Sequence, residues 1–271
     1  MPNPSNACDP SSPDRADVAA ALYIQGGAHD ASHRCDANDR HGTHDLFAEL
    51  ARALRLQSHH TVVDVCAGAG QHVVRFAPLV ARAVGYDFSE AAVAAARQRG
   101  AEAYVADGAS LPLPGGSADA LNCAFGIYYL DDLAAAIGEW ARVLRPGGRV
   151  VISGPARGTN AELYAFHERA TGAGPSDADT MALGYVDDVV RQALLAGPFT
   201  EVEVQTFVNP IEFPDAAAFL DYWRTTSLFL RSERANADAG AQLLAGHAGP
   251  LRVTKRVSIL SATRSDRPAH S

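Results

Sequence analysis

The sequence predicts an α/β fold built on a doubly wound, mostly parallel sheet. Strand and helix signals alternate between residues 61 and 154, and each strand signal is a short apolar run that ends in polar or glycine-containing sequence. Such alternation is typical of right-handed βαβ units, which bring the carboxyl ends of their strands to one edge of the sheet. The predicted strands are residues 61–66, 82–87, 102–106, 118–125 and 148–154.

The elements outside this stretch are predicted from periodicity. Residues 16–24 and 44–56 have helical patterns and would precede the sheet, and residues 160–171 and 185–196 would follow it as helices. Alternating apolar residues near 202–208 and 253–262 then predict two more strands, which brings the expected number to seven.

A helical insertion is expected between those last two strands. Pro214 and Asp215 would begin a helix that carries apolar residues nearly all round it. They are Phe219, Leu220, Tyr222, Trp223, Leu228, Phe229 and Leu230. Two interpretations stay open: a lid over an organic substrate, or a helix packed on the sheet edge or across a dimer interface.

Length and composition favour one domain. With 271 residues, of which 47% are hydrophobic, the chain can bury one sizeable core. Residues 1–16 are rich in Pro, Ser, Asn and Asp, so we expect a disordered tail there and a single domain over 17–271. That domain would include an N-terminal helical cover, 17–58, and a substrate-lid insertion, 212–250.

Charge and cysteine usage exclude several classes of partner. The net charge is −8 and the basic residues form no stripe, which argues against nucleic acid as a partner. No apolar run is long enough to span a membrane. The four cysteines form no C-x-x-C pair and no secretory signal precedes them, so we expect a cytoplasmic protein. The expected partner is a small-molecule substrate, and a homodimer is left open.

The most informative segment is residues 62–70, Val-Val-Asp-Val-Cys-Ala-Gly-Ala-Gly, followed by a helix over 71–80. A strand, a glycine turn and a helix N-terminus bring bare backbone amides against a ligand. Asp87 ends the next strand, 23 residues after Asp64, near the spacing at which a carboxylate binds ribose hydroxyls. These features predict a nucleoside-containing cofactor. A dinucleotide is not favoured, because the third glycine of G-x-G-x-x-G is missing, and there is no phosphate-binding G-x-x-x-x-G-K-[ST] loop.

The segment resembles the first motif of class I S-adenosylmethionine (SAM) dependent methyltransferases. Three further blocks of that family follow in order, at residues 84–89, 104–114 and 143–152, the last reading Val-Leu-Arg-Pro-Gly-Gly before strand five. The resemblance covers roughly residues 60–154. It implies the Rossmann-like methyltransferase fold, with the last strand antiparallel, and SAM as the cofactor. Cys66 stands where the first glycine is usual in the family, so we expect its backbone to avoid positive φ.

The resemblance also implies roles for individual residues. The backbone of the glycine turn would contact the methionine moiety, Asp87 the ribose and Asp107 the adenine amino group, with Phe88 against the ring. Asp64 would lie near the site, either toward the cofactor or in a structural hydrogen bond to the glycine turn. The expected cofactor-binding residues are Tyr23, Asp64, Ala67, Gly68, Gly70, Asp87, Phe88, Asp107, Gly108, Ala109 and Phe125.

The catalytic group is harder to predict, because methyl transfer depends mainly on positioning, and a base is needed only if the acceptor must lose a proton at the start. After strand four, Tyr128 is preferred over Tyr129, since one of two adjacent residues faces inward. His41, in the cover, and Tyr164, after strand five, are further candidates. No metal is expected: His29, His33, Cys35, His41 and His44 match no established ligand spacing.

The predicted function is SAM-dependent methyl transfer to a small organic molecule in specialised metabolism. One alternative keeps SAM but transfers or cyclises its aminocarboxypropyl group, releasing methylthioadenosine. A second alternative is a non-catalytic partner protein with the same fold.

Overall fold

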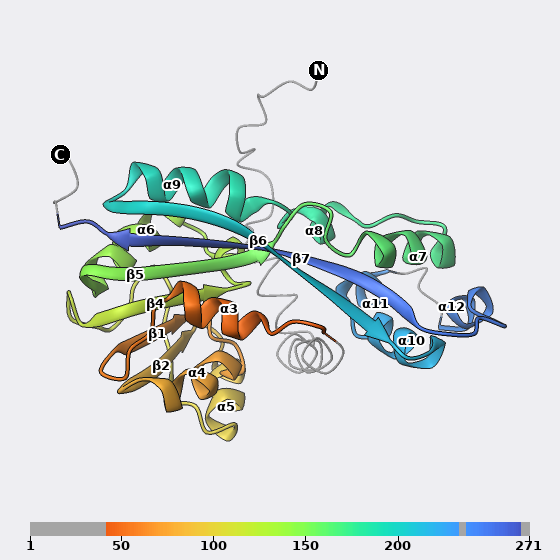
Figure 1. Ribbon diagram of the computed structural model, residues 1–271, viewed down its shortest axis with the longest axis horizontal. Helices are drawn as coiled ribbons and strands as arrows, with labels where there is room; N and C mark the ends of the chain where they lie inside the picture. The colour runs from red at the N-terminus through yellow and green to blue at the C-terminus, as the bar shows by residue number, and fades with distance from the viewer. Residues whose placement is uncertain (1–41, 233–236, 267–271) are drawn as a thin grey trace, which may run out of the picture.

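The computed structural model describes residues 42–232 and 237–266, and within them seven strands form one sheet in the order β3-β2-β1-β4-β5-β7-β6 (Figure 1). β1 to β5 are parallel, and β7 is antiparallel to both of its neighbours, β5 and β6. The predicted fold class is confirmed. The strands are β1 (Thr61–Val65), β2 (Arg82–Asp87), β3 (Ala103–Val105), β4 (Ala118–Ala124), β5 (Leu144–Pro155), β6 (Phe199–Phe213) and β7 (Leu251–Arg264).

Helices cover both faces of this sheet. In Figure 1, α3, α4 and α5 lie on one side, and α6 and α9 lie on the other. The predicted helix over 16–24, together with Tyr23 and His41, lies outside the described residues. The helices are α3 (Leu46–Ala53), α4 (Gln71–Phe76), α5 (Glu90–Gln98), α6 (Leu133–Val143), α7 (Ala161–Thr171), α8 (Asp177–Thr180), α9 (Arg191–Ala196), α10 (Ala216–Arg224), α11 (Ser227–Arg231) and α12 (Ala237–Leu243). A 3₁₀ turn, Ala77–Leu79, extends α4, and a π-helical turn, Val186–Val190, precedes α9.

Short polar side chains fix where several helices begin. Ser89 accepts a hydrogen bond from the backbone N–H of Ala92 at the start of α5, as its position after β2 predicts. Asp215 does the same for Ala218 at the start of α10. Each cap satisfies a backbone donor that the helix itself leaves unpaired, so the turns that leave the sheet edge are well defined.

β5 differs from the prediction at its beginning. The Pro-Gly-Gly sequence was expected to be a turn before a strand over 148–154, but the strand begins at Leu144. Its pairing with β4 shifts, from Ala118 opposite Leu144 to Ala120 opposite Arg149. The extra residues form an irregularity within the strand, and Gly147 adopts φ +75° there.

The far halves of β6 and β7 extend beyond the parallel strands and carry a helical lobe of α7, α10, α11 and α12 (Figure 1). β5 points toward this lobe, which therefore lies beyond the carboxyl ends of the parallel strands. Most of the apolar residues of the predicted insertion are buried in the lobe, against α7 and the hairpin. Leu230, by contrast, is 54% exposed. Packing within the lobe thus accounts for most of the apolar surface of this helix, for which the sequence allowed two interpretations.

Candidate cofactor site

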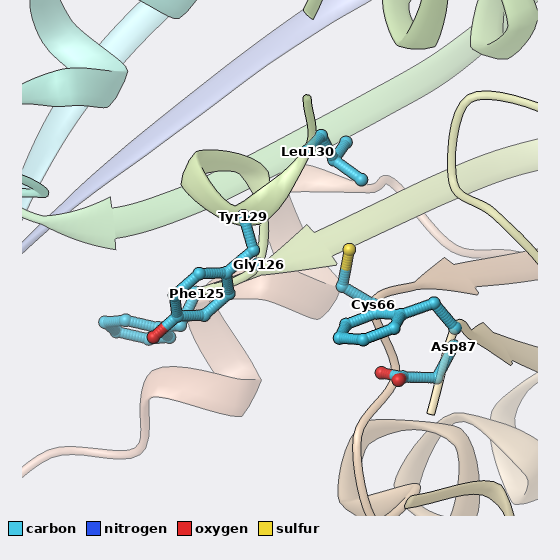
Figure 2. Close-up of a pocket in the computed structure, with 7 residues that line it drawn as sticks. Cys66, Asp87, Phe125, Gly126, Tyr129 and Leu130 are labelled. Carbon is cyan, nitrogen blue, oxygen red and sulfur yellow. The ribbon is translucent and has the colours of Figure 1, made fainter. Parts of the chain in front are cut away.

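A cavity lies at the carboxyl ends of β1, β2 and β4, where the sequence predicts a cofactor. Its volume is about 50 Å³, and it opens to solvent. In Figure 2, Tyr129, Phe125 and Gly126 lie on one side of it, with Cys66 and Asp87 on the other. Its lining residues are Cys66, Asp87, Phe88, Phe125, Gly126, Tyr129 and Leu130.

Asp87 is the acidic group of the cavity. One carboxylate oxygen accepts from the N–H of Gly68 at 2.8 Å, and the other accepts from the N–H of Ser89 at 3.0 Å. Burial raises the pKa of Asp87 above its ordinary value, while these two backbone hydrogen bonds lower it. A carboxylate has about four acceptor positions, so each oxygen can still accept from a ligand hydroxyl. Asp87 therefore both fixes the glycine turn and offers acceptors to a ribose.

The glycine turn needs its glycines for two different reasons. Gly68 and Gly70 both have positive φ, +54° and +73°. A Cβ on Gly70 would also lie 2.8 Å from the Cβ atoms of Ala96 and Ala101, so the turn packs directly on α5 and the segment after it. The turn is held to the neighbouring strand by the hydrogen bond from Ala67 N–H to the Tyr86 carbonyl, 3.0 Å long.

Cys66 corrects one expectation from the sequence. It has φ +56°, in the left-handed region that its replacement of a glycine was expected to avoid. Opposite it, Gly126 leaves room: a Cβ on Gly126 would overlap the Cys66 Cβ and lie 2.9 Å from its Sγ. The cysteine side chain thus fills space that a glycine at position 126 provides, and it lines the cavity with sulfur.

This contact predicts the effect of a substitution. Gly126→Ala should destabilise the fold by about 1–3 kcal/mol, the usual penalty for overpacking, because the new methyl group has no place beside Cys66. Cys66→Gly in the same chain should restore most of the loss in urea denaturation. Gly138→Ala is the matched control, since a Cβ there meets nothing within 4 Å and α6 should gain stability. Equal losses in the single and double variants would contradict the contact.

The loop after β3 lies beside Asp87. The N–H of Ala106 donates to the Asp87 carbonyl at 3.0 Å, and Asp107 accepts from the N–H of Ala109 at 2.8 Å. Trp140, on α6, donates from its indole Nε1 to the Gly108 carbonyl at 2.8 Å. Asp107 is exposed and Gly108 is buried. The structure therefore brings together the two carboxylate-bearing loops that the sequence assigned to the ribose and the adenine.

Two aromatic side chains are exposed at the cavity. Phe88 is 45% exposed and Phe125 is 36% exposed, and Phe125 also has φ +56°. A bulky residue in that backbone region is strained, and such strain is concentrated at functional sites. Exposed aromatic faces beside a buried carboxylate fit a ligand that has a flat ring and hydroxyl groups, as an adenosyl group has.

Tyr129, rather than Tyr128, lines the cavity. Both belong to the 3₁₀ turn Ile127–Tyr129, in which successive residues point about 120° apart. Tyr128 is directed into the core, where it is 9% exposed and lies near Gly154 of β5. The lining of the cavity therefore favours Tyr129 over Tyr128, which the sequence preferred, because the sequence does not fix the rotation of a single turn. Tyr164 packs against the lobe rather than lining the cavity.

Asp64 does not line the cavity either. It is 2% exposed beneath the glycine turn, and its carboxyl group accepts a hydrogen bond from the side-chain amide of Asn122 on β4.

Gly126, Tyr129 and Leu130 line the cavity but were not among the predicted residues. Their position directly after β4 was the signal in the sequence that could have identified them. No group of three or more His, Cys, Asp or Glu residues suited to a metal occurs within 42–232 and 237–266. In the same ranges, no helix has the length and apolarity to cross a membrane.

The fold is that of an α/β domain with a cavity at the carboxyl edge of its sheet, and comparison with known families gives the class of its central segment. Residues 63–152 match the family model described as a methyltransferase domain. The matched segment contains the glycine turn, Asp87, Asp107 and the strand-five block. The resemblance seen in the sequence is thus confirmed: this segment is a class I methyltransferase domain, of the kind found in SAM-dependent transferases, and its cofactor is S-adenosylmethionine.

Individual relatives are similar over part or all of the chain. The demethylmenaquinone methyltransferase of Corynebacterium efficiens is 35% identical over 100 residues, which are 37% of this chain and 44% of that protein. The chain thus spans less than half the length of that relative. A putative type II methyltransferase from Anaeromyxobacter dehalogenans has a TM-score of 0.58 at 23% identity, covering 80% of this chain and 94% of its own. The [4+2]-cyclase SpnF has a TM-score of 0.55 at 18% identity, covering 94% and 98%. These two solved structures share the fold.

Proposed function

We propose that the protein transfers the methyl group of SAM to a small organic acceptor. The observation that carries the proposal is the cavity in which the Asp87 carboxylate, the glycine turn and two exposed aromatic rings converge. When bound there, SAM would supply an electrophilic methyl group on a sulfonium. The chain's own contribution is to hold donor and acceptor in line and to exclude water.

The residues of the cavity divide this task. Asp87 would accept hydrogen bonds from the ribose, and the N–H groups of the glycine turn would lie along the methionine moiety. Asp107, with Gly108 and Ala109, would bind the adenine edge, and Phe88 would cover its ring. Phe125 and Tyr129, which follow β4 on the opposite side, would face the sulfonium end and the acceptor. An aromatic face near a sulfonium adds an attraction of about 0.5–2 kcal/mol.

The acceptor would enter from the side of the helical lobe, because the lobe and the cavity both lie at the carboxyl ends of the parallel strands. The lobe also lies outside residues 63–152, the segment that matches the methyltransferase-domain model. Because the lobe lies outside the segment that binds the cofactor in this proposal, it can select the acceptor, and we place the reaction in specialised metabolism. The Corynebacterium relative is named for demethylmenaquinone, and a quinol is therefore a sensible first compound to assay.

Product analysis tests the proposal. The full chain is incubated with SAM that carries a labelled methyl group and with an extract of small metabolites, and the products are separated by mass spectrometry. S-adenosylhomocysteine together with a labelled compound supports methyl transfer. Methylthioadenosine would instead support transfer or cyclisation of the aminocarboxypropyl group. Absence of heat on titration with millimolar SAM would favour a non-catalytic partner protein.

Tyr129 gives a more local prediction. Tyr129→Phe should lower kcat by on the order of tenfold while changing SAM affinity little, because the phenol faces the acceptor side of the cavity. The acceptor found by product analysis is used for the assay. Tyr128→Phe is the neighbouring comparison, with a smaller effect expected from its position in the core. A larger loss in Tyr128→Phe would return the role to that residue.

A further inference from the structure

Two buried polar atoms beneath the glycine turn have no hydrogen-bond partner among residues 42–232 and 237–266. Asp64 on β1 and Asn122 on β4 lie directly opposite each other in the parallel ladder, and they are 2% and 0% exposed. Asn122 Nδ2 donates to Asp64 Oδ1 at 2.6 Å. The other atoms of the same two groups, Asp64 Oδ2 and Asn122 Oδ1, are buried and have no partner in the described part of the chain. Both orphan atoms are oxygens, so neither can donate to the other while Asp64 is ionised.

The charge of an ionised Asp64 would therefore be buried with too few hydrogen bonds to stabilise it. It would accept one hydrogen bond from a neutral amide, and turning the amide over would place oxygen against oxygen. Among the described residues, Asn122 acts on the Asp64 carboxyl by its hydrogen bond and Asp87 acts on it by negative charge. The negative charge of Asp64 is also one of the effects that raise the pKa of the Cys66 thiol, two residues later in the chain. Burial, the largest of these effects, raises the pKa of Asp64 to about 7.

We propose that Asp64 is a neutral carboxylic acid in the folded protein, and that its proton lies on Oδ2 and is donated to the amide oxygen of Asn122. The proton converts two unpaired oxygens into one hydrogen bond, so that acid and amide bind each other reciprocally. Asp64 is then a positioning residue. It ties the end of β1 to the end of β4, the two strands that lead into Cys66 and Phe125 of the cavity.

The proposal fixes the sign of a pH dependence. The folded-state pKa of Asp64 lies above the ordinary value of 3.8, so the folded state binds this proton more tightly than the unfolded state. The stability that the group contributes is complete below about pH 4, declines as the pH rises toward 7, and is lost above the folded-state pKa. His72 and His60 give a slope of opposite sign, because burial lowers the pKa of His72 to about 4 and also lowers that of His60. Unfolded histidines still bind protons at pH 6.5, so this slope extends into the range from pH 6.5 to 8.5. The difference between the wild type and an Asp64 variant therefore isolates Asp64.

The test is thermal unfolding of the full chain and of Asp64→Asn across that range. An asparagine can accept from Asn122 and also donate to it, so it imitates the neutral acid and never ionises. Between pH 6.5 and 8.5 the wild-type midpoint should fall by about 2–3 °C relative to that of Asp64→Asn. Asp221→Asn, which neutralises an exposed carboxylate on α10, is the matched control and should follow the wild type. Parallel profiles of the wild type and Asp64→Asn, or an Asp64→Asn variant less stable than the wild type at pH 8.5, would overturn the proposal.

A second measurement reads the proton directly. In protein labelled with ¹³C at aspartate carboxyl groups, the Asp64 resonance is assigned by its loss in Asp64→Asn. It should report a protonated acid at pH 6 and titrate only near or above neutrality. An ionised carboxylate already present at pH 5 contradicts the proposal, whatever the unfolding profiles show. Neither measurement depends on the proposed function.

SAM affinity supplies the readout that a purely structural role would not move. In calorimetry, the wild type should bind SAM several-fold more weakly at pH 8.5 than at pH 6.5, because ionised Asp64 keeps only one of its two hydrogen bonds to Asn122 and positions the ends of β1 and β4 less firmly. In Asp64→Asn the affinities at the two pH values should agree. This arm rests on the proposed cofactor site. A wild type that binds no SAM would count against that site, while the unfolding and carboxyl measurements would still decide the state of Asp64.

Discussion

Replacing Trp140 with alanine should lower the free energy of unfolding by about 3–5 kcal/mol, the range measured for large aromatic residues deleted from cores. Trp140 is fully buried between α6 and the sheet, and its indole N–H holds the Gly108 carbonyl. The substitution therefore leaves a cavity and also frees the loop that follows β3. Urea denaturation followed by circular dichroism measures the loss.

The matched pair Trp140→Phe and Trp223→Phe separates packing from the loop contact. Both variants keep an aromatic ring and lose one buried indole hydrogen bond, to Gly108 in the first case and to His167 in the second. Only Trp140→Phe touches the loop of Asp107. It should therefore weaken SAM binding, while Trp223→Phe, which lies in the lobe, should lose stability with little change in SAM affinity. Equal SAM affinities in the two variants would show that the hydrogen bond of Trp140 to Gly108 does not affect cofactor binding.

Asp87→Ala should weaken SAM binding by on the order of 100-fold, or about 3 kcal/mol. The first cause follows from the sequence alone: the variant lacks the charged acceptor that would bind the ribose hydroxyls. The structure adds a second cause, because the same carboxylate holds the N–H groups of Gly68 and Ser89. Removing it frees the glycine turn and the cap region of α5 together. Isothermal titration calorimetry of the full chain measures the change.

Asp107→Ala is the comparison for Asp87. Asp107 is exposed, and among the described residues its carboxylate accepts a hydrogen bond from the N–H of Ala109 alone, so its removal should weaken SAM binding less than Asp87→Ala does. Circular dichroism should show that both variants are folded before binding is compared. Affinity that is unchanged in Asp87→Ala would reject the assignment of the cavity to the ribose.

Much of the sheet was predictable because its signals are local. Strand periodicity, the glycine turn and the caps at Ser89 and Asp215 lie within a few residues of the features they specify. Asp64, Gly68 and Asp87 could also be placed near one another from sequence, because parallel strands that follow one another align their carboxyl ends. The same rule brought Asp107 to the site.

The remaining features depend on contacts between distant segments. Which of Tyr128 and Tyr129 faces the cavity depends on the rotation of one 3₁₀ turn, which no periodic pattern records. The positive φ of Cys66 is tolerated because Gly126, 60 positions later, makes room for its side chain. Likewise, the apolar helix α10 packs against the part of the β6–β7 hairpin that extends beyond the sheet, and the sequence does not show how far that hairpin extends.

That hairpin has a mechanical consequence. Its ladder runs without a break from Phe213 opposite Leu251, inside the lobe, to Val204 opposite Leu260, in the sheet beside β5. Because the pairing is continuous, the hairpin has no hinge, and β6 and β7 connect the lobe rigidly to the sheet. A movement of the lobe would therefore have to twist both strands. Deleting the lobe would leave β6 and β7 without their connection and weaken the antiparallel edge of the sheet.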